Sequence, residues 1–170
     1  MKQFQKRLNN LLNEVIIEAN SIDIPISNNI NPLVFINKRA KSRFGACKSE
    51  NINNKKHFKI EIRSALYICD DFKIKEVLAH EVLHTCKGCQ NHGNTWKKYA
   101  KMMNNKYGYN IKRVANNSYY DLDNTNIAYK YKIVCNSCGN EIYRQKKSKV
   151  IANIKNYRCK CGGTLRVEIL

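Results

Sequence analysis

Three histidines and one glutamate fall within thirteen consecutive residues, and their spacing constrains this chain more than any other feature. His80, Glu81 and His84 form an HExxH pentapeptide, and His92 follows after seven intervening residues, directly before Gly93. On a helix, residues four apart lie on one face about 5–6 Å apart at Cβ, so His80 and His84 can bind one metal ion. Glu81 lies about 100° further round the helix. The pattern therefore predicts a zinc site with three histidine ligands, in which Glu81 is the general base of metal-assisted peptide hydrolysis.

Two cysteines beside this motif leave other interpretations open. Cys86 and Cys89 lie close enough in the sequence to supply a fourth ligand, which would make the zinc site structural and leave no open position for a substrate. The pair can also be packing beside an active site, a redox-sensitive pair or a competing metal clasp. We favour catalysis for the histidines and packing for the two cysteines.

The flanking sequence predicts the helix that this site requires. Asp70 and Asp71 are suited to a helix N-terminus, and apolar residues then recur at helical spacing. Gly88 is expected to end the helix, so that the chain turns back and His92 reaches the metal from a loop. A second helix is expected from about residue 95 to residue 107. Its apolar positions are assigned to the core: Trp96, Tyr99, Ala100 and Met103.

The motif and its surroundings resemble those of the SprT-like (Spartan-type) zinc metalloproteases. HEVLH is followed by a short loop and then by HG. Upstream, a basic stretch over residues 37–44 precedes Gly45-Ala46-Cys47, which is similar to a G-x-C that this family carries on a β-hairpin. Residues 60–66 look like the strand that follows it. A C-terminal module with paired cysteines is also a recurrent partner of this domain.

The resemblance implies a fold, an activity and a substrate class. The fold is a zincin-like minidomain, and the activity is that of a zinc metalloendopeptidase with Glu81 as its base. The implied zinc ligands are His80, His84 and His92. The implied substrates are proteins that are bound or crosslinked to DNA, as in DNA–protein crosslink repair.

A second zinc site is expected near the C-terminus. Eight cysteines in an intracellular protein favour metal binding over disulfides. Two cysteine pairs, C-x-x-C and C-x-C, are separated by 20 residues, and Gly162 and Gly163 after the second pair supply the backbone freedom that its tighter turn needs. The predicted ligands of a structural zinc ion are Cys135, Cys138, Cys159 and Cys161. The chain is thus expected to bind two Zn²⁺ ions, one catalytic and one structural.

These features predict an α+β protein with a β-rich tail. The SprT-like metalloprotease domain is assigned to residues 1–114, a linker to residues 115–128 and a zinc ribbon to residues 129–170. The first domain is expected to open with an amphipathic helix, because apolar residues recur there at helical spacing. Short strands are expected near residues 33–37, 43–48 and 58–63. Among single residues, Cys47 and Cys69 are expected to be buried and His57 to lie in a solvated loop.

The charge of the chain indicates a polyanionic partner. Lys and Arg exceed Asp and Glu by 18, and residues 129–170 hold ten basic and two acidic residues. The alternative is compositional bias, since an AT-rich genome favours lysine, although bias does not explain the scarcity of acids. DNA with single-stranded character is the expected partner, bound through phosphate contacts and one aromatic ring. The candidate contacts are Tyr143, Arg144, Lys146, Lys147 and Lys149.

The N-terminal residues do not resemble an export signal, and no apolar stretch is long enough to span a bilayer. We therefore expect a cytoplasmic protein associated with DNA or the nucleoid and no membrane partner. Two other functions stay open. One is a general zinc peptidase whose ribbon binds other proteins, and the other is a non-catalytic nucleic-acid-binding protein stabilised by zinc. The sequence does not identify the natural substrate, the oxyanion-stabilising residue or the oligomeric state.

Overall fold

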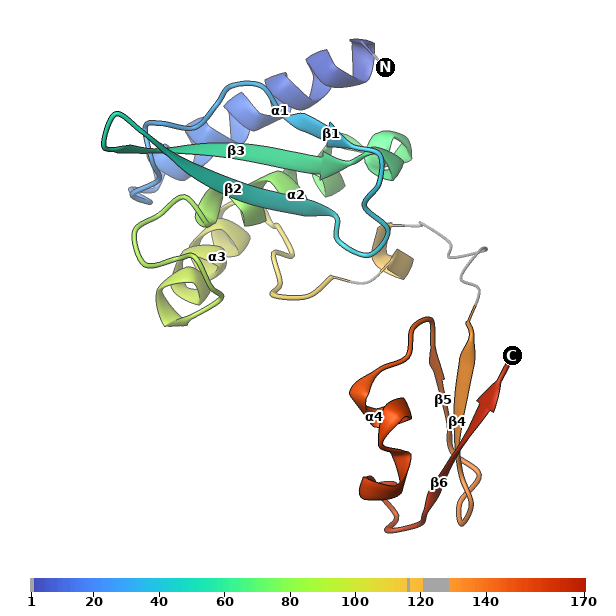
Figure 1. Cartoon of the computed structure of the whole chain (residues 1–170). Helices are drawn as coiled ribbons and strands as arrows, with labels where there is room; N and C mark the ends of the chain where they lie inside the picture. The colour runs from blue at the N-terminus through green and yellow to red at the C-terminus, as the bar shows by residue number, and fades with distance from the viewer. Residues whose placement is uncertain (1, 116, 121–128) are drawn as a thin grey trace. The chain divides into compact units, whose positions relative to one another are not determined.

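The computed structural model describes residues 2–115, 117–120 and 129–170. The chain divides into two compact units, Met1–Asp123 and Asn124–Leu170. Each unit combines helical segments with a β-sheet (Figure 1), which confirms the predicted α+β class. In the described part of the chain, no helix is both long enough and apolar enough to cross a membrane.

The first unit opens with the predicted amphipathic helix, α1 (Lys2–Ser21). Its apolar residues recur every three or four positions and form one buried face that packs against helix α2 (Asp71–Leu83). The buried residues of α1 are Phe4, Leu8, Leu11, Leu12, Val15 and Ala19. Because this face covers α2, it helps to shield the helix that carries HExxH from water.

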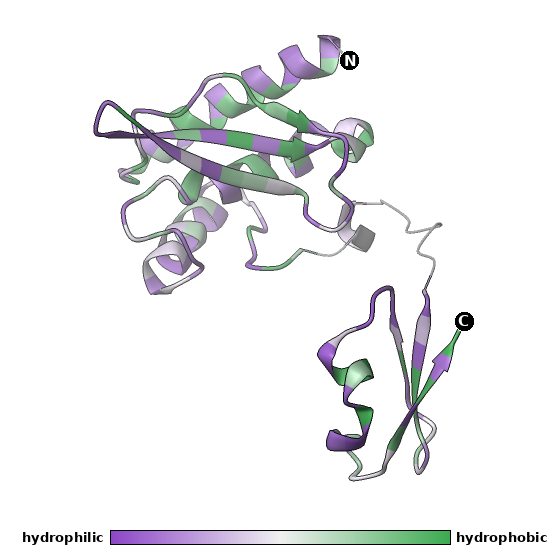
Figure 2. Ribbon diagram, viewed as in Figure 1, coloured by the Kyte–Doolittle hydropathy of each residue, from purple (hydrophilic) through white to green (hydrophobic). Residues whose placement is uncertain are grey.

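The sheet of the first unit contains β1 (Phe35–Asn37), β2 (Gly45–Ile52) and β3 (Lys55–Arg63) in the order β1-β3-β2. β1 runs parallel to β3, whereas β2 is antiparallel to it. Hydrophobic and hydrophilic residues alternate along β3 (Figure 2), as expected for a strand with one buried face. The predicted strands are therefore present, and β2 forms an outer strand of this sheet.

β2 and β3 are longer than predicted because they form a tight hairpin. Asn53 and Asn54 connect them with φ values of 49° and 61°, and asparagine tolerates this left-handed conformation in two-residue hairpin turns. His57 was predicted to lie in a loop, and this was wrong. It lies in β3 opposite Glu50, since the hairpin extends the ladder past it.

Helix α2 begins as predicted and ends earlier than predicted. The side chain of Asp70 caps it by accepting a hydrogen bond from the backbone N–H of Lys73 (2.7 Å). The helix ends at Leu83, not at Gly88, because the next three N–H groups bond to carbonyls three residues back, which tightens the last turn. Gly88 lies in the turn that follows, with φ at 79°. A short 3₁₀ segment, η1 (Ser64–Ile68), connects β3 to α2.

Helix α3 (Asn94–Tyr107) confirms the second predicted helix. Trp96, Ala100 and Met103 are buried on its inner face. The helix ends at Gly108, whose φ of 73° is the left-handed conformation that glycine adopts readily.

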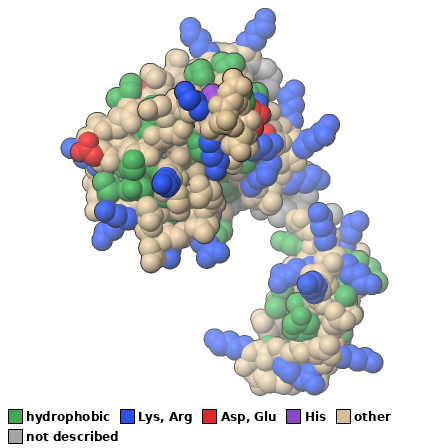
Figure 3. All heavy atoms as spheres, turned by 60° about the vertical axis from the view of Figure 1, so that its left-hand side comes forward, with side chains coloured by type: hydrophobic (Ala, Val, Ile, Leu, Met, Phe, Trp, Pro, Cys, Tyr) green, Lys and Arg blue, Asp and Glu red, His purple; other side chains and the backbone are tan. Residues whose placement is uncertain are grey.

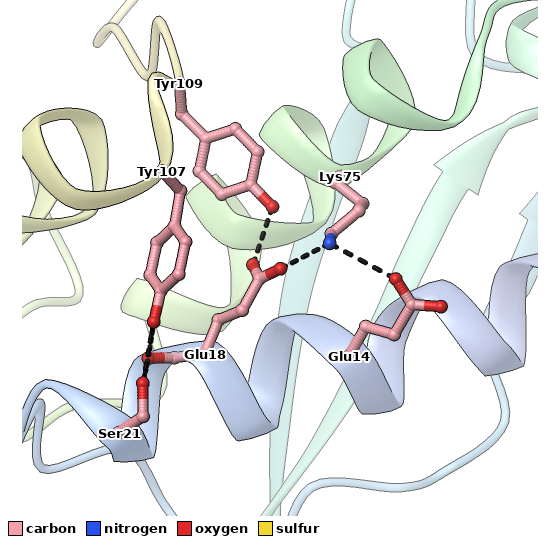
Figure 4. A network of polar contacts seen from close by, with 6 residues as sticks. All are labelled: Glu14, Glu18, Ser21, Lys75, Tyr107 and Tyr109. Carbon is pink, nitrogen blue, oxygen red and sulfur yellow. Dashed lines mark hydrogen bonds and ion pairs between the residues drawn. The ribbon is translucent and has the colours of Figure 1, made fainter.

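A polar network fixes α2 against α1 (Figure 4). Lys75 of α2 forms ion pairs with Glu14 and Glu18 of α1. Glu18 also accepts a hydrogen bond from the hydroxyl of Tyr109 (2.6 Å), while the hydroxyl of Tyr107 donates to the backbone carbonyl of Glu18 (3.0 Å). This network thus holds three elements together at one point: α2, which carries HExxH, the opening helix α1 and the segment after α3.

The first unit extends beyond the predicted limit at residue 114. The 3₁₀ segment η2 (Asn117–Tyr120) places the ring of Tyr120 4.5 Å from that of Phe44, and Tyr120 is buried. The thiol of Cys69 donates to the carbonyl of Tyr120 (3.5 Å). Most of the predicted linker, residues 116 and 121–128, lies outside the described residues.

The second unit is built on a sheet of β4 (Tyr131–Cys135), β5 (Glu141–Arg144) and β6 (Leu165–Ile169). Both outer strands are antiparallel to β4, in the order β5-β4-β6. Helical segments that the sequence analysis did not predict, α4 (Lys149–Ala152) and η3 (Ile154–Asn156), lie between β5 and β6. Ser148 caps α4 through a hydrogen bond from the N–H of Ile151 (3.4 Å).

Candidate active site and metal centres

The structure brings the three predicted histidine ligands together. His80 lies on α2, His84 is the C-cap of that helix, and His92 comes from the loop before α3. One ring nitrogen from each histidine lies within 4.8 Å of the others, and the Nε2 atoms of His80 and His92 are 2.9 Å apart. This is the convergence that a shared metal ion requires.

Backbone carbonyl groups select the metal-binding tautomer of two of these rings. Nδ1 of His80 lies 3.0 Å from the carbonyl oxygen of Lys112, and Nδ1 of His84 lies 2.6 Å from that of Cys89. A carbonyl oxygen only accepts hydrogen bonds, so Nδ1 must carry the proton and Nε2 is left with a free lone pair. The donor set therefore fits a zinc ion.

The local environment also favours the neutral form of His80 and His92, which is the form that binds metal. Burial, together with neighbouring His84 and His92, lowers the pKa of His80 to about 3. Burial, His84 and the charge of Arg113 lower the pKa of His92. A protonated imidazole is therefore disfavoured at either position near neutral pH.

The ring of Trp96 packs against all three histidine rings. Its ring centroid lies 4.8 Å from that of His80, 5.8 Å from that of His84 and 4.5 Å from that of His92, and it stacks on His84 at 24°. The side chain is 2% exposed. The sequence analysis assigned Trp96 to the core, which is confirmed, but its contacts with all three histidines were not predicted.

Glu81 lies beside the histidines in a buried position against the start of β2. Burial raises the pKa of its carboxyl group to about 8, against the opposing effects of a hydrogen bond from the backbone N–H of Cys47 and the charge of Arg43. A Cβ atom at residue 45 would lie 2.6 Å from Oε1 of Glu81. Glycine at this position is therefore what allows the carboxylate to approach β2.

Two cavities flank Glu81 and His80. One, of about 210 Å³, is lined by apolar residues such as Phe44 and Val77 and by charged residues such as Glu76 and Arg113. The other, of about 430 Å³, contains His84, His92 and the first residues of β2. Arg43 borders both. Both cavities thus adjoin Glu81 and His80.

Cys86 and Cys89 pack in the core, 1% and 0% exposed. Within the described residues, the side-chain groups placed to share an ion are the three histidines and the four C-terminal cysteines, and neither group includes this pair. Burial and the neighbouring Cys89 raise the pKa of Cys86 to about 12, which disfavours a reactive thiolate. The geometry thus supports packing over a fourth ligand or a redox pair.

The two remaining cysteines of the first unit differ from each other. Cys69 is buried, as predicted. Cys47 was also expected to be buried, but it is only half-buried, because it lies where β2 borders the larger cavity.

The four cysteines of the second unit also converge. Their sulfur atoms lie within 4.8 Å of one another, with 3.6 Å between Cys135 and Cys161 and 3.6 Å between Cys138 and Cys159. Zn–S bonds of about 2.3 Å in a tetrahedron place sulfur atoms about 3.8 Å apart, so the set fits zinc. The N–H groups of Ser137 and Cys138 point at the sulfur of Cys135 and lower the pKa of that thiol.

The short C-x-C pair is accommodated by the glycines after it. Gly162 has φ at 86°, and its N–H bonds to the carbonyl of Cys159 (2.8 Å). A Cβ atom on Gly163 would lie 2.8 Å from the sulfur of Cys135. Both glycines are therefore required for the turn to close on the other cysteine pair.

The candidate nucleic-acid contacts lie at one end of the second unit. Arg144 ends β5, Lys149 begins α4, and Lys146 and Lys147 lie in the exposed connection between them. Lys and Arg side chains are spread over the surfaces of both units in Figure 3. Whether these four side chains bind DNA stays a prediction.

Tyr143 has a neighbour that the sequence analysis missed. It is 40% exposed, and its ring lies 5.4 Å from that of Tyr129. Tyr129 precedes β4, whereas Tyr143 lies in β5, so the strand pairing brings the two rings together. The only sequence signal was the high tyrosine content of this region, which does not reveal the pairing.

The fold and the histidine site of the first unit define a zincin-like metal-binding domain. The sequence agrees with this class of domain, because the model of the SprT-like family matches residues 4–116. The chain therefore belongs to the SprT-like family. A search of curated proteins found none with a matching sequence.

Proposed function

We propose that this protein is a zinc-dependent endopeptidase that acts on DNA-bound or DNA-crosslinked proteins. The observation that carries the proposal is the convergence of three histidines, two with their Nδ1 protons fixed by carbonyl groups, beside a buried glutamate. His80, His84 and His92 would hold the ion. When bound, zinc supplies a Lewis acid for the scissile carbonyl and lowers the pKa of a water molecule.

Glu81 is the proposed general base. Its carboxylate takes the proton of the attacking water and delivers it to the leaving amine. Burial favours this role, because a raised pKa brings the carboxylate closer to the basicity that a general base needs near neutral pH. The N–H of Cys47 and the absence of a side chain at Gly45 keep the carboxylate in place against β2.

The outer strand β2 is the proposed docking edge for the substrate. Gly45, Ala46 and Cys47 line the cavity that holds the histidines, and β2 pairs with β3 on its other side. An extended peptide can add to such an edge through main-chain hydrogen bonds. This mode favours unfolded segments over folded substrates.

The proposed DNA-binding element is the second unit. It combines a net charge of +8 over residues 129–170 with the exposed ring of Tyr143, and Tyr129 lies next to that ring. Paired aromatic rings beside basic residues suit unpaired bases and their phosphates. The four cysteines would hold a structural zinc ion that keeps this small sheet folded.

The test is cleavage of a DNA-binding protein with and without single-stranded DNA. We expect zinc-dependent cleavage that DNA stimulates for a DNA-binding substrate and does not stimulate for a substrate without DNA affinity. Equal cleavage of both substrates with and without DNA would instead favour the general zinc peptidase. Absence of cleavage in zinc-loaded protein would leave the non-catalytic alternative.

A further inference from the structure

The segment that holds His80 has no regular secondary structure of its own. Residues 109–112 follow α3 without helix or strand, yet the carbonyl of Lys112 must sit 3.0 Å from Nδ1 of His80. A segment outside a helix or sheet lacks the hydrogen-bond ladder that would fix such a carbonyl. Other groups must therefore hold it.

Asn104 of α3 binds both backbone groups of the residue before Lys112. Its Nδ2 donates to the carbonyl of Ile111 (3.2 Å), and its Oδ1 accepts from the N–H of Ile111 (2.8 Å). Two bonds from one planar amide hold the two peptide groups on either side of the Ile111 Cα, including the one that leads to Lys112. The carbonyl of Lys112 is one residue further along the chain.

Glu76 holds the preceding residue. Its Oε1 accepts from the N–H of Asn110 (2.5 Å), and the side chain is 2% exposed. Glu76 lies on α2 four residues before His80, so both project from the same side of that helix. Within the described residues its Oε2 atom has no hydrogen-bond partner, and the carboxylate also interacts with the hydroxyl of Tyr119, so the bond to Asn110 is its contact with the backbone of this segment.

We propose that Asn104 and Glu76 are positioning residues for the metal site, acting through the backbone of residues 110–112 on the imidazole of His80. Each of the three consecutive residues is bound by a side chain, from Glu76, Asn104 and His80 in turn. Without this clamp the Lys112 carbonyl moves away and Nδ1 loses its acceptor. His80 then populates the tautomer whose Nε2 carries the proton and cannot bind metal. The inference rests on the proposed histidine metal site.

The main test replaces Asn104 by alanine and compares it with Asn105→Ala. Asn105 is the exposed neighbour on the same helix, so it controls for the loss of an asparagine from α3. Zinc affinity of the histidine site is measured by competition with a chelator, and the tautomer of His80 is read by ¹⁵N NMR in metal-free protein. Changing a partner of a metal-bound histidine costs about 10–100-fold in affinity, and we expect about tenfold for Asn104→Ala because it acts one step further away.

Three further variants separate positioning from general destabilisation. Glu76→Gln keeps an acceptor for the N–H of Asn110 and should retain near wild-type zinc affinity, whereas Glu76→Leu removes it and should weaken zinc binding. Asn104→Asp keeps the bond to the Ile111 N–H but loses the donor, so it should fall between wild type and Asn104→Ala. If Asn104→Ala fails to fold, Asn104→Asp and the Glu76 pair carry the test.

The outcomes distinguish this inference from the proposed function. Wild-type zinc affinity and an unchanged His80 tautomer in Asn104→Ala would overturn it, as would an equal effect of Asn105→Ala. If the wild-type protein cleaves no substrate, the endopeptidase proposal is overturned, but the positioning inference is not. The tautomer and the zinc affinity do not depend on turnover, so the clamp is tested in that case too.

Discussion

Gly45 and Glu81 meet at a point where no side chain fits. A Cβ atom at residue 45 would lie 2.6 Å from Oε1 and 2.7 Å from Cγ of Glu81. The outer strand β2 and the HExxH helix therefore approach each other through a glycine, and the carboxylate of Glu81 is positioned by that approach. The consequence is that the base is sensitive to a residue far from it in the sequence.

We expect Gly45→Ala to reduce cleavage strongly and to leave the zinc site loaded. The added methyl group must displace the Glu81 carboxylate, and a misplacement of about 1 Å can cost about 100-fold in rate. Overpacking should lower the free energy of unfolding by about 1–3 kcal/mol. The measurement is kcat/KM with zinc content, using Asn105→Ala as a control, because Asn105 is exposed on α3 and lines neither cavity. Unchanged kcat/KM in Gly45→Ala would contradict the assigned role of this contact.

Glu81→Gln should abolish proteolysis while zinc content stays at the wild-type level. The amide cannot accept the proton of the attacking water, and proton transfer by a positioned side chain contributes about 10²–10⁴-fold to rate. Asp23→Asn, at an exposed acid in the turn after α1, is the matched control and should retain full activity. Loss of zinc from the histidine site in Glu81→Gln, or retained cleavage, would show that Glu81 is not the base.

The wild-type protein should contain two zinc ions per chain that can be removed independently. His92→Ala should remove one ion together with activity, because three ligands are needed at the catalytic site. Replacing Cys135 and Cys138 by serine should remove the other ion and unfold the second unit alone. Elemental analysis and circular dichroism of each unit check this. A wild-type content of one ion, unaffected by the cysteine changes, would exclude the structural zinc site.

DNA binding should weaken steeply with salt through the basic end of the second unit. On single strands, log Kd should change by about 0.7 per phosphate contact for each unit of log salt. Reversal of Arg144, Lys146, Lys147 and Lys149 to glutamate should flatten this slope and remove stimulation by DNA, while basal cleavage is retained.

The control for this experiment reverses four exposed lysines on α3. These residues are Lys97, Lys98, Lys101 and Lys106. The two variants have the same net charge, so a difference between them reports the site and not the overall charge. If the slope of log Kd against log salt falls by the same amount in both variants, the basic end of the second unit is not a specific contact.

Glu61 should stabilise the fold at neutral pH and lose this effect in acid. Burial raises the pKa of this carboxyl group, but hydrogen bonds from Lys48 and Asn37 and the charges of Lys48 and Arg43 outweigh it, so the pKa lies below its ordinary value of 4.5. A lowered folded-state pKa contributes stability above the unfolded-state pKa, and this contribution is lost as pH falls through the folded-state pKa. Glu61→Gln should therefore be less stable than wild type at neutral pH, with the difference shrinking below about pH 4.5. Urea unfolding at several pH values measures this, and a constant difference would contradict it.

Several features could be predicted because they depend on neighbouring residues. The HExxH spacing predicts a metal site because helix geometry alone places His80 and His84 on one face. The cysteine pairs and their glycines likewise predict a second metal site, and the apolar spacing of α1 identifies its buried face. Element ends were predicted less well, since the end of α2 depends on hydrogen bonds of its last turn.

What the sequence by itself determined is therefore the chemistry of the ligands and the local geometry that presents them. Only the tertiary structure decided which distant groups complete the site. These include the glycine against Glu81, the Lys112 carbonyl on His80 and the Asn104 clamp. In the second unit, the pairing of the Tyr129 and Tyr143 rings was likewise decided by the tertiary structure. The physical reason is that spacing along a helix follows from its backbone hydrogen bonds, whereas contacts between remote segments depend on how the whole core packs.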